Sequence, residues 1–525
     1  MNRAPSPISL RVGVTPVDTL PSALACETQA VIAVIVVSFL ARLALAAVLG
    51  FSFDETYDVV VARRLALAYY DHPPAIMWLI HAAVALTGSE DHLIVRLPTL
   101  LLFSAQNWLL YRLTAHLFDR SAGLFAVIAL SLSPQFFYFG TIAVTDGPLI
   151  FALTGAALFA ARAVFAEGAT PWRDWLLAGL FFGLALLSKF SAILVLPGLV
   201  LVVLTMPRHR RLFLTPAPYV AALLAVLVFA PVIVWNVENG FASLLFQGDR
   251  AAMGTELEIG RTLTHIAILM LVTGPLIWVM QLGALAGALR AGPRDEPRWF
   301  FAMLATVPIA LFLVIDLFGT DGVAATHWPA PGYLFTFPLL GAALAQLSAR
   351  FPRAIRATIA AGIAGMSILV LVILTDTLTG WPRAFAPSFN DYDPIVSDQA
   401  DWWNFRDTLQ GRGLLDSRRY FILAGRYEFC FKAQLVLKDS LPVVCLTDNP
   451  ISKSLWRDDA ALRGRDAIII TSWWDAPQSL ATVRGKFTRF EVIPPIWMTA
   501  YDRPVMRVEL ALGSDLQRTI FEAGR

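Results

Sequence analysis

Residues 30–57 read AVIAVIVVSFLARLALAAVLGFSFDETY, and the interpretation of the whole chain starts from this stretch. Residues 30–51 are apolar except for Ser38 and Arg42, and about 20 such residues suffice to cross a bilayer core. Two adjacent carboxylates, Asp54 and Glu55, follow within a few residues. We therefore expect a transmembrane helix that leads directly into an acidic segment at the membrane surface.

Composition extends this interpretation to most of the chain. Of the 525 residues, 57% are hydrophobic and 15% are charged, whereas soluble proteins carry about 25% charged residues. Charged residues make up about 11% of residues 1–378 and about 25% of residues 379–525. This excludes a soluble cytoplasmic enzyme and indicates a membrane part followed by a soluble domain. The net charge of +2 gives no basis for a nucleic-acid partner, which would need a concentrated basic surface.

Apolar runs recur along the first 378 residues, so we expect an α-helical polytopic membrane protein with about eleven transmembrane helices. After residues 30–51, the expected spans are residues 93–113, 122–139, 148–165, 175–187, 191–205, 218–235, 263–289, 300–317, 329–347 and 355–375. The fifth and sixth spans are short, so a single tilted helix with Lys189 buried inside it is the alternative.

Arginines set the expected orientation. They cluster in alternate short loops, near residues 208–211, 290–298 and 350–356, and loops of this kind face the cytoplasm. Residues 1–29 are then a cytoplasmic leader and residues 30–378 a transmembrane domain. An odd number of spans places residues 379–525 on the opposite face of the membrane.

The first outer loop, residues 52–92, is too long for a simple turn. It holds two amphipathic stretches, residues 56–69 and 75–86, which suit helices lying along the membrane interface. YDHPP at residues 70–74 joins them, and its two prolines cannot continue a preceding helix. The chain must turn there, so Asp71 and His72 are presented at the membrane surface.

Residues 379–525 have a different pattern, in which short β-rich runs alternate with charged, helix-compatible stretches. This pattern indicates a small α/β domain. Cys430 and Cys445 lie in it, and Cys26 precedes the first span. A disulfide between Cys430 and Cys445 is one interpretation if the domain faces an oxidising compartment, and two unpaired buried thiols are the other.

The acids and the histidine of the first outer loop are candidates for chemistry. Asp54 and Glu55 would repel each other unless one is protonated, metal-bound or paired, and such a carboxylate can act as a general base toward a hydroxyl. The alternative for Asp54 is an N-cap at a solvated helix start. Asp71 and His72 could hold a divalent cation, or His72 could donate to a phosphate. A polar turn closed by prolines is the alternative.

Charged residues in the later outer loops are further candidates. Asp146 follows one span and starts another, where capping a helix would be a sufficient role. Lys189 is the only lysine before residue 379, and ionisable groups at membrane depth are functional candidates, although snorkelling to the interface is the alternative. Arg250 and Arg261 break the positive-inside trend and suit recognition of phosphate or carboxylate, unless their loop is simply solvated.

His327 and Trp328 open a late span, where Trp328 suits an interfacial anchor. All these candidates map to one face of the membrane. The residues alone therefore indicate an outward-facing membrane enzyme that acts on an amphiphilic phosphate or sugar. A lipid-linked sugar flippase or transporter is the rival, but it predicts broken or polar segments near the bilayer midplane. A non-catalytic glycan-binding or assembly subunit is a third possibility.

Several short motifs, taken in order, resemble one family. They are FDETY at residues 53–57, YDHPP at 70–74, VRLP at 95–98, LSP at 132–134, TDGP at 145–148, GLALLSK at 183–189 and HWPAP at 327–331. Together they resemble bacterial glycosyltransferase family 39, the protein O-mannosyltransferase and aminoarabinose-transferase group with the GT-C fold. The DHPP and HWPAP forms are similar to the branch that includes lipid A and core galacturonosyltransferases.

The resemblance implies a polyprenyl-phosphate sugar donor and inverting transfer at the periplasmic face of the bacterial inner membrane. The implied acceptor is lipid A or core, another glycolipid or a cell-surface glycan, and membrane lipids surround the protein. Asp54 would match the family's general base or acceptor organiser, with Glu55 beside it in the same motif. Lys189 would match the lysine that binds donor phosphate, and the expected further phosphate contacts are His72, Arg250 and Arg261.

The expected sugar or acceptor contacts are Asp146, Tyr57, His327 and Trp328. This chain departs from the aminoarabinose transferases, which carry EKPP where residues 71–74 read DHPP. The acid that helps to hold a metal is kept as Asp71, whereas the phosphate-binding lysine becomes His72 and an arginine becomes Tyr57. A divalent metal at Asp71 is therefore an expectation that the motif leaves open.

Overall fold

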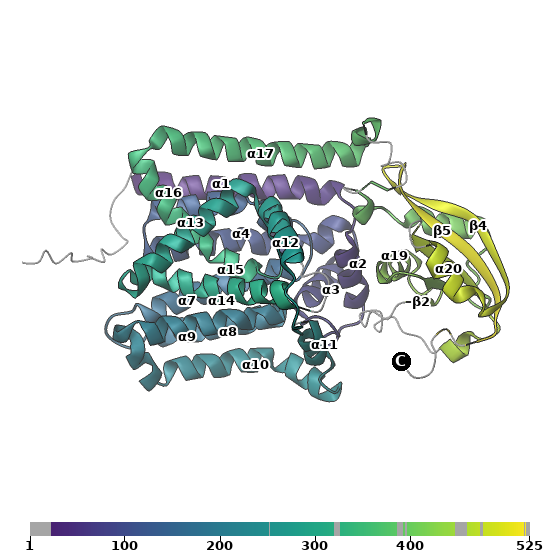
Figure 1. Ribbon diagram of the computed structural model, residues 1–525, viewed down its shortest axis with the longest axis horizontal. Helices are drawn as coiled ribbons and strands as arrows, with labels where there is room; N and C mark the ends of the chain where they lie inside the picture. The colour runs from purple at the N-terminus through teal and green to yellow at the C-terminus, as the bar shows by residue number, and fades with distance from the viewer. Residues whose placement is uncertain are drawn as a thin grey trace, which may run out of the picture.

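The structure is a computed structural model that describes residues 23–250, 252–319, 326–385, 392–393, 396–446, 459–472, 476–518 and 520. A bundle of long helices forms one end of the molecule, and a β-sheet with its covering helices forms the other (Figure 1). This confirms the predicted fold class, a helical membrane part with a small C-terminal α/β domain. Most of the predicted leader, residues 1–29, lies outside the described residues, which begin at residue 23.

The bundle consists mainly of long helices, several of which, such as α1, α10 and α17, run along the long axis of the molecule (Figure 1). They are α1 (Ala23–Val48), α4 (His92–Leu117), α5 (Arg120–Ser131), α7 (Asp146–Val164), α8 (Trp172–Ser188), α9 (Val195–Thr205), α10 (Ala217–Glu238), α13 (Pro275–Ala291), α14 (Glu296–Phe318), α16 (Thr336–Arg350) and α17 (Pro352–Thr379). Within the described ranges, seven helices are long and apolar enough to cross a membrane, or up to nine when each sharply bent pair counts as one span. The chain is thus a multi-pass membrane protein, and the count of about eleven stays a prediction.

Chain breaks explain where the expected spans differ from the helices. Lys189 is extended (φ −159°, ψ 136°) between α8 and the short 3-10 helix η1 (Phe190–Leu194) that precedes α9, so the single tilted helix is wrong. The span expected at residues 263–289 is not one straight helix. There α12 (Ile259–Thr273) and α13 form a bent pair at an angle of 106°, because Gly274 adopts φ 96° and Pro275 begins a new helix.

The first outer loop forms two short helices, α2 (Phe53–Ala62) and α3 (Ala75–Thr87). The first amphipathic stretch was expected to reach residue 69, but α2 ends at Ala62. The chain then turns, and the Tyr69 N–H donates to the His72 carbonyl at 3.0 Å. Two prolines separate this turn from α3, as their chemistry requires.

Close helix packing positions α7 and α8. A Cβ on Gly179 would lie 2.2 Å from the Ala221 carbonyl oxygen, so only glycine allows α8 to approach α10 this closely. A Cβ on Gly147 would lie 2.6 Å from a Thr99 methyl carbon, which brings the start of α7 against α4. These two contacts position the helix that begins at Asp146 and the helix that ends just before Lys189.

The C-terminal domain contains a five-stranded sheet of order β2-β1-β3-β5-β4. Its strands are β1 (Tyr420–Ala424), β2 (Val443–Cys445), β3 (Asp466–Ser472), β4 (Phe487–Ala500) and β5 (Arg503–Leu516). The first three are parallel, and β5 pairs antiparallel with both β3 and β4. Helices α18 (Trp403–Gly411), α19 (Tyr427–Leu437) and α20 (Ala476–Arg484) cover it (Figure 1).

Several contacts dock this domain on the membrane part, two of them at the first span and the first outer loop. The β4–β5 turn reaches the end of the first helix, where Tyr501 Oη donates to the Val48 carbonyl at 2.9 Å. Helix α19 lies against α2, and Arg63 of the first outer loop donates to the carbonyls of Gln434 and Leu435 at 3.1 and 3.0 Å. A cation at the carbonyl end of a helix is favourable because that end carries partial negative charge.

Cys430 and Cys445 form a disulfide that joins α19 to β2 across 15 residues. The disulfide alternative is therefore confirmed over two free thiols.

Replacing both cysteines by serine is expected to lower the stability of the C-terminal domain by about 3 kcal/mol, because the loop of the unfolded chain is no longer closed. Thermal unfolding of the purified full-length protein measures this loss. Reductant should lower the midpoint of the wild type and leave that of the double variant unchanged; equal midpoints for the two proteins would contradict the prediction.

Candidate active site

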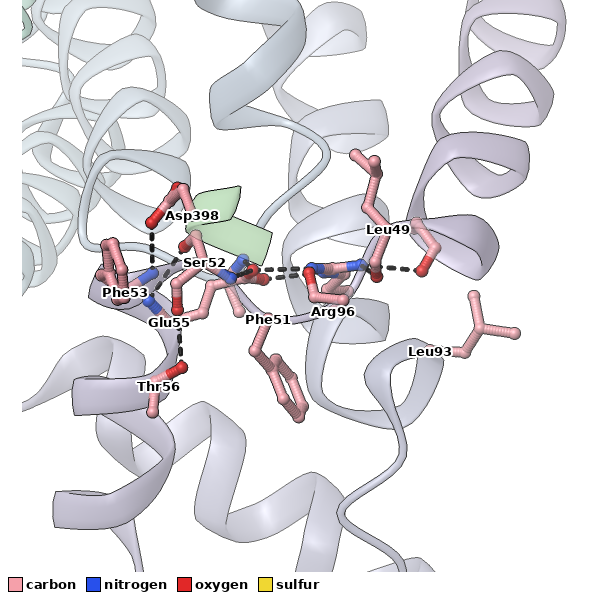
Figure 2. Close-up of polar contacts among 12 residues, drawn as sticks. Leu49, Phe51, Ser52, Phe53, Glu55, Thr56, Leu93, Arg96 and Asp398 are labelled. Atoms are coloured by element: carbon pink, nitrogen blue, oxygen red, sulfur yellow. Dashed lines mark hydrogen bonds and ion pairs between the residues drawn. The ribbon is translucent and has the colours of Figure 1, made fainter. Parts of the chain in front are cut away.

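The acidic segment after the first span forms the first turn of α2. Ser52 is the N-cap: its Oγ accepts from the Glu55 N–H at 3.1 Å, and Glu55 Oε2 accepts from the Ser52 N–H at 3.0 Å (Figure 2). This capping box satisfies two N–H groups that a helix start leaves without partners. The N-cap alternative for Asp54 is therefore wrong, because Ser52 occupies that position.

Glu55 forms a buried ion pair with Arg96 of α4 (Figure 2). Arg96 Nε and Nη2 each donate to one carboxylate oxygen at 2.7 Å, and the Ala143 N–H donates to Glu55 Oε1 at 2.8 Å. Neither side chain has any exposed surface. Burial opposes ionisation of Glu55, but the charge and hydrogen bonds of Arg96 outweigh it and hold the pKa of Glu55 below its usual value.

Arg96 also closes the end of the first span. Its Nη1 donates to the carbonyls of Ala46 and Leu49 at 2.8 and 2.7 Å, and its Nη2 donates to the Gly50 carbonyl at 2.6 Å. All five guanidinium N–H groups thus have acceptors. No role was predicted for Arg96, although it belongs to the VRLP motif at residues 95–98.

Asp54 differs from its neighbour because solvent reaches its side chain. Protein atoms nonetheless surround the carboxyl group. The resulting desolvation raises the pKa of Asp54 to about 6, and the negative charge of Asp398 adds to the rise while Lys189 opposes it. A carboxylate with this pKa can accept a proton near neutral pH, so Asp54 has the properties of a general base.

Lys189 and Asp146 join the end of α8 to the start of α7. Lys189 Nζ donates to both oxygens of Asp146 at 2.9 and 2.8 Å, and the two side chains are 9% and 6% exposed. Snorkelling of Lys189 into solvent is therefore wrong, and Asp146 has a charged partner in addition to its place at the start of a helix.

Tyr57 and His72 both contact Asp71. Tyr57 Oη donates to Asp71 Oδ1, and His72 Nε2 lies 3.3 Å from Asp71 Oδ2. Gln247, in α11 (Ala242–Arg250), donates to the Asp71 carbonyl at 2.7 Å. Burial lowers the pKa of His72 while the Asp71 charge opposes the fall, so the imidazole is mainly neutral at pH 7.

Helix α11 also brings Arg250 to the late span that carries His327 and Trp328. The Arg250 guanidinium lies 4.6 Å from the centre of the Trp328 ring and 5.4 Å from that of Phe246. Burial, followed by the positive charge of Lys189, lowers the pKa of His327 to about 3. His327 is therefore a neutral donor or acceptor near that lysine.

The structure brings most of the predicted site residues into one region. Mutual electrostatic effects connect Asp54, Asp71, His72, Asp146, Lys189, Arg250 and His327. Arg261 is used at a helix end: its Nη2 donates to the carbonyls of Asp316 and Gly319 at the end of α14, at 2.9 and 2.7 Å. These contacts stabilise a helix end and give no support to the predicted contact with donor phosphate.

Sequence reasoning missed Asp58, which is 3% exposed and lies one helical turn after Asp54. Burial raises its pKa well above the usual value, and the charges of Asp71 and Asp54 add to the rise. Burial therefore favours the neutral form of Asp58, one helical turn from the candidate base. The four-residue spacing from Asp54 on a helix was the signal that could have found it.

The predicted metal site does not fit the residues present. Across the part of the chain that is described, no three His, Cys, Asp or Glu side chains lie close enough to hold a metal ion. Asp71 is instead bonded to Tyr57 and paired with His72. We therefore derive no step of the reaction through a metal.

Comparison with solved structures identifies the class of fold. ArnT from Cupriavidus metallidurans, bound to undecaprenyl phosphate, superposes with a TM-score of 0.65, covering 93% of this chain and 98% of ArnT. Its apo state gives 0.63 with the same coverage. The identities of 16% and 15% mean that this likeness concerns the fold alone, which is the predicted GT-C fold.

Sequence comparison identifies relatives. Residues 71–235 match the family described as dolichyl-phosphate-mannose-protein mannosyltransferase. The lipid A galacturonosyltransferase RgtD of Rhizobium johnstonii is 29% identical over 296 residues, which are 54% of this chain and 58% of that protein. The alignment thus spans less than two thirds of the relative's length. These matches confirm the resemblance to the glycosyltransferase group that the motifs predict.

The Glu55–Arg96 pair predicts a large stability effect. Glu55→Gln leaves the Arg96 charge buried without a counter-charge, so we expect a loss of about 3–5 kcal/mol in the free energy of unfolding. The matched control is Glu167→Gln, since the Glu167–Arg208 pair is 79% and 67% exposed and should contribute under about 1 kcal/mol. Thermal unfolding of both purified variants measures the difference. Equal, small losses would show that the buried pair does not hold the fold.

Proposed function

We propose that this protein is a bacterial inner-membrane glycosyltransferase that transfers a sugar from a polyprenyl-phosphate donor to lipid A or a related glycolipid or glycan, with inversion, at the periplasmic face. The single observation that carries the proposal is the placement of Asp54. Solvent reaches this carboxylate, its pKa is raised to about 6, and the buried Lys189–Asp146 pair lies near enough to affect its charge. Such a site can deprotonate an acceptor and stabilise a leaving phosphate together.

In the proposed reaction, the acceptor hydroxyl oxygen attacks the anomeric carbon of the sugar on the side opposite the phosphate. The carbon–oxygen bond to the phosphate breaks, its electron pair leaves with polyprenyl phosphate, and the hydroxyl proton passes to Asp54. The anomeric configuration inverts. Where the acceptor is itself a phosphate, Asp54 positions it instead of accepting a proton. Glu55 takes no part in the transfer, because its four acceptor positions are occupied by protein N–H groups.

Lys189 would neutralise the charge that develops on the leaving phosphate. Two of its three N–H groups bond Asp146, which leaves one for a ligand. Arg250, held over Trp328, would supply a second positive charge, and the neutral His72 a hydrogen bond. Tyr57, His327 and Trp328 would then contact the sugar or the acceptor.

An apolar cavity supports a lipid-linked donor. Its volume is about 330 Å³, and it lies among α7, α8, α9, α10 and α14. Leu186, one of its lining residues, lies one helical turn before Lys189. A donor whose phosphate meets Lys189 could therefore place its first isoprene units in apolar surroundings. The orientation, with residues 379–525 in the periplasm, follows from the arginine-rich loops.

The substrates are tested by mass spectrometry of lipid A and total glycolipids from a deletion strain. We expect one glycolipid to lose the mass of a single sugar, and lipid A lacking a uronic acid is the outcome that the resemblance to RgtD favours. The loss should be restored by the wild-type gene. Unchanged glycolipids and glycans would refute the transferase proposal and favour a flippase or a binding subunit.

The base predicts a pH dependence. Only ionised Asp54 accepts a proton, so a pKa of about 6 means that transfer by the wild type should fall about tenfold between pH 7 and pH 5. Asp54→Asn should lower transfer by at least about 100-fold at pH 7 and remove this pH dependence, while Asp54→Glu keeps part of the transfer activity. Initial rates of sugar transfer, measured with purified protein, test both statements. An active Asp54→Asn variant would exclude this residue as the base.

The Lys189–Asp146 pair predicts opposite effects on binding of undecaprenyl phosphate. Lys189→Met removes a charged hydrogen-bond donor to the phosphate group, so the affinity for undecaprenyl phosphate should fall about tenfold or more. Asp146→Asn removes a competing negative charge and should raise affinity. Binding to the two purified variants, measured with labelled undecaprenyl phosphate, gives both signs. Equal weakening by both substitutions would assign the pair a structural role only.

A further inference from the structure

The C-terminal domain reaches the helix that carries Asp54. Asp398, in the 3-10 helix η6 (Ser397–Gln399), accepts from the Phe53 N–H through Oδ1 at 2.8 Å (Figure 2). Phe53 is the first residue of α2, and its N–H has no partner within that helix. A residue 345 positions away in sequence therefore completes the cap directly beside the candidate base.

Lys432 holds the same segment through the preceding residue. Its Nζ donates to the Phe51 carbonyl at 2.5 Å and to the Ala400 carbonyl at 3.3 Å, and it lies 5.2 Å from the centre of the Phe53 ring. Lys432 comes from α19, and its side chain is 1% exposed. The segment that leads into α2 is thus held at Phe51 by one residue of the C-terminal domain and at Phe53 by another.

The burial of Lys432 points to a specific role for its charge. Desolvation lowers the pKa of this ammonium to about 8, and the negative charges of Asp398 and Glu55 offset part of that effect. An apolar side chain of similar length would avoid the desolvation but could not donate to the Phe51 carbonyl. The ammonium of Lys432 thus has a specific role, which is to bond the backbone just before α2.

Resting on the proposed function of Asp54, we propose that Asp398 and Lys432 are positioning residues: they fix the first turn of α2 so that the Asp54 carboxylate meets the acceptor, and the C-terminal domain thereby completes the active site. Neither residue needs to touch substrate. Both residues act on Asp54 through the backbone of residues 51–53, which they bond. Asp398 also acts on Asp54 through its negative charge.

Several elements contribute charges that act on Asp54. They are Asp398 from the C-terminal domain, Lys189 after α8, Asp146 at the start of α7 and Asp71 in the first outer loop. Tyr138 and Tyr427 also interact with the Asp54 charge. Among the charged groups, Asp398 has the largest effect on Asp54, so removing its charge should ease ionisation of the base.

The first test needs no substrate. Hydrogen exchange of backbone amides in residues 51–62 is followed in the purified full-length protein. Lys432→Met and Asp398→Ala should each speed exchange in this segment on the order of tenfold, while the β-sheet and α7 exchange as in the wild type. The controls are Arg418→Met and Asp407→Ala, two exposed positions of the same domain, which should change nothing there. Unchanged exchange in residues 51–62, or equal acceleration everywhere, would overturn the proposal.

The second test separates positioning from mere stability. Asp398→Asn keeps an oxygen acceptor for the Phe53 N–H and removes only the charge. Its maximal rate of sugar transfer should stay within about threefold of the wild type, while the acid limb of its pH profile moves to lower pH. Lys432→Met should lower kcat about tenfold with KM unchanged, since the acceptor still binds but meets a misplaced base. An unshifted acid limb with Asp398→Asn, or a change in KM alone with Lys432→Met, would contradict the assigned roles.

The two tests also distinguish this proposal from the proposed function. If the wild type transfers no sugar, the proposed function fails, and hydrogen exchange alone still decides whether Asp398 and Lys432 fix α2. If the wild type transfers sugar and Asp54→Asn abolishes transfer, but the Asp398 and Lys432 variants match their controls in both tests, the positioning proposal fails and the proposed function stands.

Discussion

The buried ion pair between Glu55 and Arg96 is the interaction on which the rest of the structure depends. Arg96 bonds the last carbonyls of the first span, while Glu55 bonds the cap of α2 and the Ala143 N–H that precedes α7. Four segments thus meet at two side chains. A charged pair without exposed surface is stable only when all its donors and acceptors are used, as they are here. This constraint leaves Asp54, rather than Glu55, directed to solvent.

The charges around Asp54 explain how one face of a membrane protein can do chemistry. Burial raises the pKa of both Asp54 and Asp58, and the neighbouring carboxylates add to the rise. Lys189 is the cation whose charge opposes these acids, and Asp146 holds it in place. A lipid-linked phosphate would add a further negative charge to this region. The burial and the negative charges that raise the pKa of Asp54 therefore also favour positive charge at Lys189 and Arg250.

Much of the fold was predictable because membranes impose simple rules on composition. Apolar length predicted most helices, and the alternation of β-rich runs predicted the small α/β domain. The errors occurred at residues 122–139 and 263–289. There Pro134 and the Gly274-Pro275 pair interrupt helices inside continuous apolar runs, giving α5 and α6 (Pro134–Phe139) in the first case and the bent pair in the second. Hydropathy counts side chains and does not register a change of backbone direction.

The sequence by itself determined that this is a membrane protein with a soluble C-terminal domain, and that its candidate residues gather on one face. It did so because burial in lipid restricts residue type along the whole chain. Only the tertiary structure decided which of two adjacent acids is exposed, that Lys189 pairs with Asp146, that Arg261 bonds the end of α14, and that Asp398 and Lys432 contact the start of α2. These facts depend on contacts between residues up to 381 positions apart, which no local pattern encodes.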